Sequence, residues 1–109
     1  MLDFETTESL ILEWATARNI FTGSSPISQF EKTEEEVREL EDALQQDRFA
    51  YSSSNDLDIK DAIGDIMVTL TTIAHMKGFS LTECYAYAYN DIKDRKGTMV
   101  NGVFVKEKS

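Results

Sequence analysis

Residues 66–76, with the sequence IMVTLTTIAHM, include no Asp, Glu, Lys or Arg. A helix that carries no charge on any side is normally buried on all sides. The segment therefore predicts a helix held between a neighbouring helix and a second layer. Because a chain of 109 residues has few elements for that layer, we expect a partner subunit to supply it. The apolar stripe of this helix consists of Ile59, Ile63, Ile66, Leu70 and Ile73.

Helical spacing of apolar residues, interrupted by turn-forming residues, divides the chain into helices. An Asn-Gly pair at 101–102, between apolar residues, predicts a two-residue turn and a β-hairpin in the C-terminal tail, residues 98–109. We expect one domain, residues 1–109, that is all-α: an oligomeric four-helix bundle with this short hairpin tail. The predicted helices span residues 7–20, 28–47, 57–77 and 80–95.

Local signals mark the ends of these helices. SLTE at 80–83 is a capping box for the fourth helix, and Gly78 suits the C-terminal end of the third. A Thr or Glu near residue 7 is the expected cap of the first helix, and Asn55 or Asp56 that of the third. FTGSSPISQ at 21–29 is expected to break the pattern, and 51–56 to form a polar loop.

The net charge of −9, from 20 acidic and 11 basic residues, limits the partners. Its field repels polyanions, which argues against binding to nucleic acid or an anionic membrane. No apolar run approaches the roughly 20 residues that span a bilayer, and MLDFETTESL has no basic residue, so no secretory signal is expected. One cysteine, Cys84, allows no internal disulfide and predicts a cytoplasmic protein.

Seven carboxylates crowd the second predicted helix, in EKTEEEVRELED at 31–42. Glu36 and Glu39 are three residues apart, so they project side by side, and Glu36 borders the packing stripe of this helix. Glu35 lies next to them in the sequence. Such crowding is usually a solvated face, and for Glu34, Glu41 and Asp42 that is what we expect.

Asp61 and Asp65 stand at the entrance to the uncharged stretch 66–76 of the third predicted helix. Four residues apart, they share a face, where two like charges are costly unless something neutralises them. If the two helices pack antiparallel, the acidic patches of both face each other and form an all-oxygen site. Hard divalent cations prefer such ligands, and Mg²⁺ commonly retains waters and binds substrate phosphates there.

These acids allow two other interpretations. A di-iron site needs Glu-x-x-His pairs, but the one histidine, His75, has Thr72 three residues before it. That chemistry is therefore excluded. A solvated acidic face without any metal stays open as an alternative.

The segments EEVRE (35–39) and DAIGDIMVTL (61–70) resemble the Glu-Glu-x-x-Glu and Glu-x-x-Asp motifs of the MazG-like family of nucleoside triphosphate pyrophosphohydrolases. SSPISQFEKTEEEVREL (24–40) and YNDIKDRKGTMVNGVFVKE (89–107) resemble its small phage-type members, so the resemblance covers about Trp14 to Lys106. One position departs from the pattern. The family has an acid three residues before the aspartate, where this chain has Ala62, and Asp61 is the available substitute.

The resemblance implies an all-α homodimer or homotetramer that hydrolyses a (deoxy)nucleoside triphosphate to the monophosphate and pyrophosphate. It implies Mg²⁺ as the cofactor, for which Mn²⁺ substitutes. Carried over by position, the metal ligands are Glu36, Glu39 and Asp65, with Asp61 as the substitute acid; the catalytic residues are Glu36 and Glu35, the latter as a further ligand or the base for water. The residues that face phosphate or base are Lys32, Asn90, Lys93 and Arg95.

Two alternatives to this activity remain at the level of sequence. The first is a pyrophosphohydrolase with a narrower substrate, such as dUTP or dCTP, a phosphoribosyl nucleotide or an alarmone. The second is a non-catalytic helical dimer that binds a nucleotide or a protein. Mg²⁺-dependent release of pyrophosphate separates the enzyme from the binding protein, whereas base selection depends on a pocket whose shape the sequence does not give.

Overall fold

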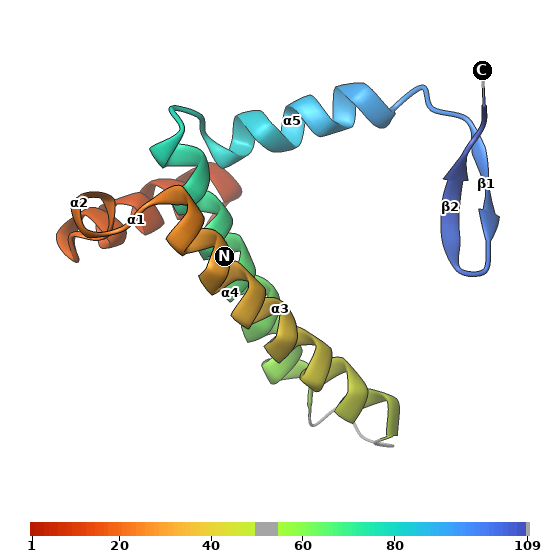
Figure 1. Cartoon of the computed structure of the whole chain (residues 1–109), viewed down its shortest axis with the longest axis horizontal. Helices are drawn as coiled ribbons and strands as arrows, with labels where there is room; N and C mark the ends of the chain where they lie inside the picture. Colours follow the sequence, from red (N-terminus) through yellow and green to blue (C-terminus); the bar gives the residue numbers. More distant parts are fainter. Residues whose placement is uncertain (50–54, 109) are drawn as a thin grey trace.

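The computed structural model describes residues 1–49 and 55–108. It is mainly helical, with a small antiparallel hairpin at the C-terminal end (Figure 1). The all-α prediction with a hairpin tail is therefore confirmed, while most of the predicted 51–56 loop lies outside the described residues. In chain order the elements are α1 (Phe4–Ala17), α2 (Ile20–Gly23), α3 (Pro26–Phe49), α4 (Asp56–Met76), α5 (Leu81–Ile92), β1 (Gly97–Val100) and β2 (Val103–Lys106).

The long helices α3 and α4 run antiparallel and pack along their length (Figure 1). Ala43 and Ala62 are both buried, and small residues at these positions let the two backbones approach closely. Further along the contact, the hydroxyl of Thr33 donates to that of Thr69 at 2.7 Å. The antiparallel packing on which the predicted acidic site depends is thus present.

Asp3, at the N-terminus of α1, is the cap that the sequence analysis missed. Its side chain accepts a hydrogen bond from the backbone N–H of Thr6 at 2.8 Å, so the helix begins at Phe4 and not near residue 7. The predicted break at 21–29 is also partly wrong, because α2 adds one helical turn there. Asn19 has a left-handed conformation, with φ 61°, and separates this turn from α1.

Asn55 precedes α4 as expected but makes no side-chain cap to that helix. Its amide instead donates to the backbone carbonyl of Ala43 on α3. Because Asn55 is buried, this hydrogen bond satisfies a group that water does not reach. The residue therefore ties the start of α4 to α3.

The start of α5 is fixed by one hydroxyl and one carboxylate. Ser80 accepts a hydrogen bond from the backbone N–H of Glu83 at 3.0 Å, as the SLTE pattern predicts. Glu8 of α1 accepts from both the backbone N–H and the hydroxyl of Thr82, each at 3.1 Å. These bonds attach the first turn of α5 to α1, while the rest of the helix projects away from α3 and α4 (Figure 1).

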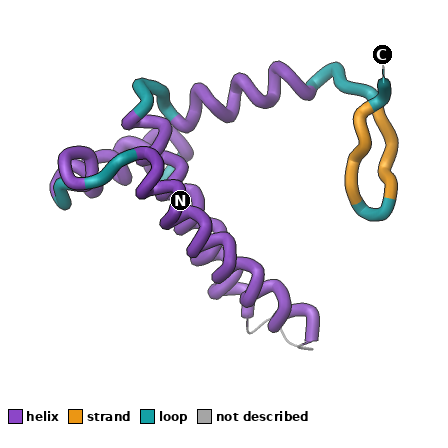
Figure 2. The backbone as a smooth tube through the Cα atoms, in the orientation of Figure 1, coloured by secondary structure: helices purple, strands orange, loops and turns teal. Residues whose placement is uncertain are grey.

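The predicted hairpin is present at the far end of α5 (Figure 2). Its turn residues Asn101 and Gly102 have φ values of 51° and 82°. Positive φ at both positions is what a two-residue turn of the primed type requires. Thr98 pairs with Val105 and Met99 with Phe104, so these side chains sit opposite one another across the strands.

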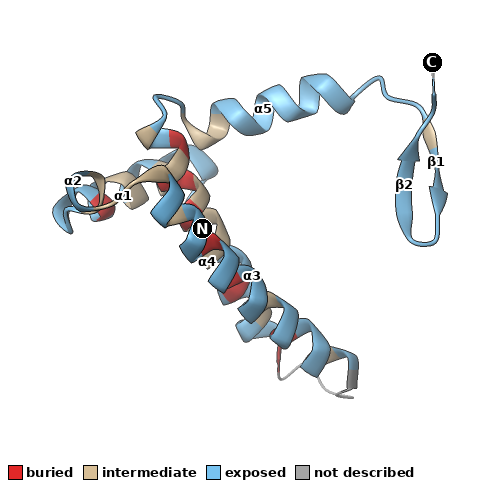
Figure 3. Ribbon diagram, in the orientation of Figure 1, coloured by how far each residue is buried: buried red, intermediate tan, exposed pale blue. Residues whose placement is uncertain are grey.

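Large apolar side chains are poorly covered in this chain (Figure 3). Among the described residues, the buried hydrophobic ones are four alanines, at positions 15, 43, 62 and 74. Within the apolar stripe of α4, Ile63 is 49% exposed, and the other four residues of the stripe are half-buried. One chain therefore supplies an α3–α4 layer crossed by α1, and the four-helix bundle is not closed within it.

None of the described helices is both long enough and apolar enough to cross a membrane.

Candidate metal centre

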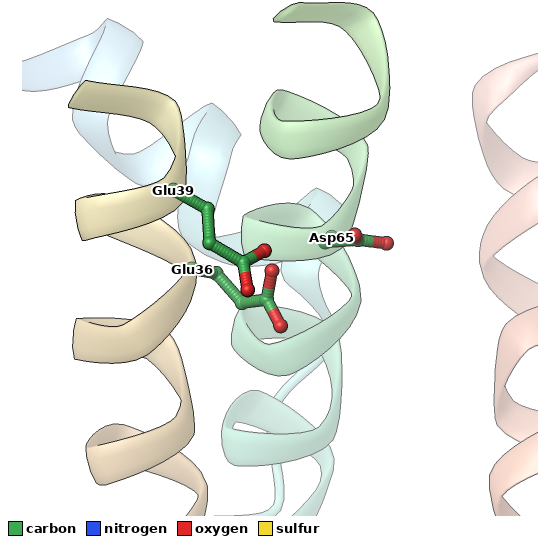
Figure 4. Close-up of side chains that lie close together, drawn as sticks. All are labelled: Glu36, Glu39 and Asp65. Carbon is green, nitrogen blue, oxygen red and sulfur yellow. The ribbon is translucent and has the colours of Figure 1, made fainter. Parts of the chain in front are cut away.

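Three carboxylates from α3 and α4 meet where the two helices face each other. Glu36 and Glu39 lie one turn apart on α3, and Asp65 comes from α4 (Figure 4). One carboxylate oxygen from each lies within 4.8 Å of the other two. We refer to these three residues as the acidic cluster. The sequence predicted all three as ligands, and the antiparallel packing is what brings Asp65 to the two glutamates.

Glu36 is the buried member of the acidic cluster, with 6% of its surface exposed. Its Oε1 lies 3.4 Å from the ammonium of Lys32, one turn earlier on α3. Its Oε2 is buried without a hydrogen-bond partner among the described residues. A buried carboxylate oxygen is costly to leave unsatisfied. This oxygen is therefore the strongest indication that the cluster binds something positively charged.

The acidic cluster alters the ionisation of its members. When Glu39 is protonated it can share that proton with the Glu36 carboxyl, and this hydrogen bond, together with the charge of Glu36, raises the pKa of Glu39 above its usual value. Burial raises the pKa of Asp65, and the charges of Asp61 and Glu36 add to that increase. Both shifts mean that the charged forms are disfavoured in the absence of a cation. A divalent ion would reverse this effect, because it stabilises carboxylates.

The donor set fits a hard divalent cation. All three groups offer carboxylate oxygens, and no sulfur or imidazole lies among them. Three protein ligands leave room for waters and for substrate oxygens, as Mg²⁺ sites usually do. Glu36, Glu39 and Asp65 are thus the residues that would hold such an ion.

Glu35 and Asp61 lie at the edge of the acidic cluster. Glu35 is exposed, with a carboxylate oxygen 3.5 Å from the ammonium of Lys32. Asp61 is exposed one turn before Asp65 and lines a hollow of about 240 Å³ with Glu39. Ala62, where the family motif has an acid, is buried between the helices. Ala62 offers no ligand, and Asp61 beside it does not belong to the group of three carboxylates that lie together.

Lys32 is the predicted substrate-binding residue that the structure brings to the acidic cluster. Hydrogen bonding with Glu36, with the charges of Glu35 and Glu36, raises its pKa, so it remains a cation. Asn90, Lys93 and Arg95 do not meet the cluster within one chain. They lie on the last turns of α5 and just beyond it, on the arm that points away from α3 and α4 (Figure 1).

A cavity of about 390 Å³ adjoins the acidic cluster. Glu36, Asp65 and Lys32 line one side, and Trp14, Gln29 and Thr72 are among the residues that line the rest. Sequence reasoning did not identify these last three. For Thr72 and its partner Gln29, the sequence signal was the set of threonines in the uncharged stretch of α4. Polar groups in a buried segment need partners, and Thr72 donates to Gln29 Oε1 at 2.8 Å.

Comparison with known proteins adds no relative: no family model, curated protein or solved structure matches this chain.

Proposed function

We propose that this protein is a Mg²⁺-dependent nucleotide pyrophosphohydrolase. Its reaction would convert a (deoxy)nucleoside triphosphate to the monophosphate and pyrophosphate. The observation that carries the proposal is Glu36 Oε2, a buried carboxylate oxygen that has no hydrogen-bond partner among the residues the structure describes and that belongs to a cluster of three carboxylates. The resemblance of EEVRE and DAIGDIMVTL to the MazG-like motifs agrees with this chemistry.

The neighbouring cavity supports a nucleotide as the ligand. Its volume of about 390 Å³ falls within the usual range for small-molecule sites, about 300–1,000 Å³. Its lining combines carboxylates and the ammonium of Lys32 with the Trp14 ring and the polar side chains of Gln29 and Thr72. Such a mixed lining suits a molecule that carries both a polyphosphate and a nucleoside.

The residues present can share the hydrolysis between them. A divalent cation held by Glu36, Glu39 and Asp65 would neutralise phosphate charge and polarise the phosphoryl oxygens. Glu35 is solvent-exposed beside the cluster and would accept the proton of the attacking water. As the water oxygen bonds to the α-phosphorus, the α–β phosphoanhydride bond breaks and pyrophosphate leaves. Lys32 would contact the polyphosphate as a cation.

We also propose that the active form is a homodimer or homotetramer. The apolar stripe of α4 is half-exposed or exposed, and on α3 Phe30, Val37 and Leu44 are each 48–49% exposed. Exposed apolar faces of this extent mark interaction surfaces. A second copy packed on the α3–α4 layer would supply the missing layer of a four-helix bundle.

The test incubates the purified protein and Mg²⁺ with a panel of nucleotides that comprises (deoxy)nucleoside triphosphates, a phosphoribosyl nucleotide and an alarmone. The expected result is pyrophosphate and monophosphate in equal amounts, abolished by chelator and by Glu36→Gln. Release of orthophosphate alone would indicate a different hydrolase. Absence of any product across the panel, with normal Mg²⁺ binding, would favour the non-catalytic nucleotide-binding dimer. Within the panel, a single preferred dUTP, dCTP, phosphoribosyl nucleotide or alarmone would establish the narrower substrate.

A further inference from the structure

The C-terminal arm, residues 93–108, has almost no support from its own chain. Among the described residues, the hairpin strands β1 and β2 pair with each other and contact no helix. A two-stranded hairpin alone is marginally stable in water. Yet the apolar side chains of this hairpin are 47–66% exposed, with Met99, Val103 and Phe104 among them. Something outside the chain is needed to cover them.

The hairpin has an apolar surface on both faces. Met99 and Phe104 share one face, and Val100, Val103 and Val105 share the other. The Phe104 ring lies over Gly97: an added Cβ there would be 2.6 Å from the ring. The Phe104 ring can take this position only because residue 97 has no side chain. The hairpin therefore presents a preformed apolar surface.

The chain exposes much more surface than a compact monomer of its mass, so whatever covers it has to bury a large area. A folded monomer of 12.4 kDa exposes about 6,100 Å², whereas this chain exposes 8586 Å². The radius of gyration is 16.7 Å, against about 13 Å for a compact domain of this length. The excess is about 2,500 Å² per chain, or about 5,000 Å² for two chains, at the upper end of the total of about 2,000–5,000 Å² that obligate dimers bury. A second copy of the chain accounts for an area of this size.

Charge indicates which surface of the second copy the arm covers. Residues 93–109 contain five basic and two acidic residues, a net charge of +3, so residues 1–92 carry −12. The strongest concentration of that negative charge is on α3 and α4, around the acidic cluster. Lys93, Arg95 and Lys96 lie at the base of the arm, directly before β1. Opposite charges steer such surfaces together.

We infer that the arm of one copy packs against the α3–α4 layer of a second copy and places Lys93, Arg95 and Lys96 beside the partner's acidic cluster. Each site would then combine carboxylates from one chain with cations from the other. This role for the cations rests on the proposed function, because a polyphosphate needs more positive charge than Lys32 provides. The packing of the arm on a second copy does not depend on catalysis.

Photo-cross-linking tests the packing without any activity. Phe104 is replaced by benzoylphenylalanine, and the irradiated protein is analysed on a denaturing gel and by peptide mapping. The expected product has twice the mass of the chain, with the cross-link in α3 or α4. A matched control carries the same probe at Glu13, an exposed residue of α1. A product of monomer mass, or equal dimer yields from both positions on dilution, would overturn the inference.

Complementation tests whether the cations act on the partner's site. Glu39→Gln disables the cluster, and Lys93→Ala/Arg95→Ala/Lys96→Ala disables the arm. When both variants are co-expressed, a mixed dimer contains one site with an intact cluster and an intact partner arm, so we expect about a quarter of wild-type activity. Activity no greater than that of the two variants alone would show that the arm acts within its own chain. If the wild type itself has no activity, the proposed function fails, and the cross-link still decides the packing.

Discussion

The ammonium of Lys32 lies 3.4 Å from Glu36 Oε1, while Oε2 of the same carboxylate is buried without a hydrogen-bond partner among the described residues. One oxygen of the Glu36 carboxylate is thus paired with a cation, and the carboxylate belongs to the cluster with Glu39 and Asp65. A lysine on the same helix therefore holds the carboxylate in place, and the remaining oxygen is left for a ligand.

Glu36→Gln should weaken Mg²⁺ binding at least about tenfold, because it replaces the buried carboxylate of the cluster with a neutral amide. The matched control is Glu34→Gln, which removes one negative charge from an exposed position of the same helix. Titration calorimetry with Mg²⁺ or Mn²⁺ measures the difference. Equal affinities in the two variants would show that binding depends on net charge and not on the cluster.

The metal-free protein should lose stability as the pH rises through the acid range. Glu39 and Asp65 have pKa values raised above 4.5 and 3.8, so the folded state binds more protons than the unfolded state. The free energy of unfolding then falls as the pH rises from these ordinary values through the raised ones. Mg²⁺ should reverse the trend, since it binds the deprotonated carboxylates.

Thermal melts across this pH range, with and without Mg²⁺, measure the effect. Glu39→Gln removes one of the two carboxyls whose pKa is raised. The stability of the metal-free variant should therefore depend less steeply on pH. A variant profile as steep as that of the wild type would mean that the pH dependence arises elsewhere.

Asp61→Asn should affect metal binding less than Asp65→Asn. Asp65 belongs to the group whose oxygens lie within 4.8 Å of one another, and Asp61 does not. We expect a loss of about threefold or less for Asp61→Asn and of at least about tenfold for Asp65→Asn. Because the charge of Asp61 raises the pKa of Asp65, its removal should also extend metal binding to lower pH. Comparable losses in both variants would place Asp61 among the ligands.

Thr72→Val should destabilise the fold by about 1–3 kcal/mol, because it removes the hydroxyl that lies 2.8 Å from Gln29 Oε1 on α3 as well as from the carbonyl of Thr69 on its own helix. Thr71→Val is the matched control. Thr71 is buried to a similar degree, but its hydroxyl bonds only the carbonyl of Met67 on its own helix. Denaturant unfolding at one fixed protein concentration measures both. A similar loss in both variants would show that the bond between α3 and α4 adds nothing.

Thermal stability should rise with protein concentration. The buried hydrophobic residues of the described chain are four alanines, so most apolar burial has to come from a second copy, and association then stabilises the folded state by mass action. Light scattering and thermal melts over a dilution series measure this. A monomer that keeps its melting temperature on dilution would contradict both the oligomer and the packing of the arm on a second copy.

Local sequence determined the helices and the hairpin. Apolar spacing placed α3, α4 and α5, the SLTE pattern placed the cap at Ser80, and Asn101-Gly102 specified the turn, because each depends on residues a few positions apart. The cap at Asp3 and the turn α2 were missed because several residues nearby could have begun or ended a helix. The cap is nevertheless local, since Asp3 accepts from the backbone of Thr6, three residues further on.

Tertiary structure decided which acidic residues belong together. The sequence singled out five carboxylates, and the crossing of α3 and α4 gathered Glu36, Glu39 and Asp65 while leaving Glu35 and Asp61 at the edge. The burial of Glu36 Oε2, which has no partner in the described part of the chain, and the cavity bounded by Gln29 and Thr72 also depend on that crossing. Sequence spacing fixes which side chains share one helix face, but the distance between faces of different helices follows from how their backbones pack, and that is set by Ala43 and Ala62.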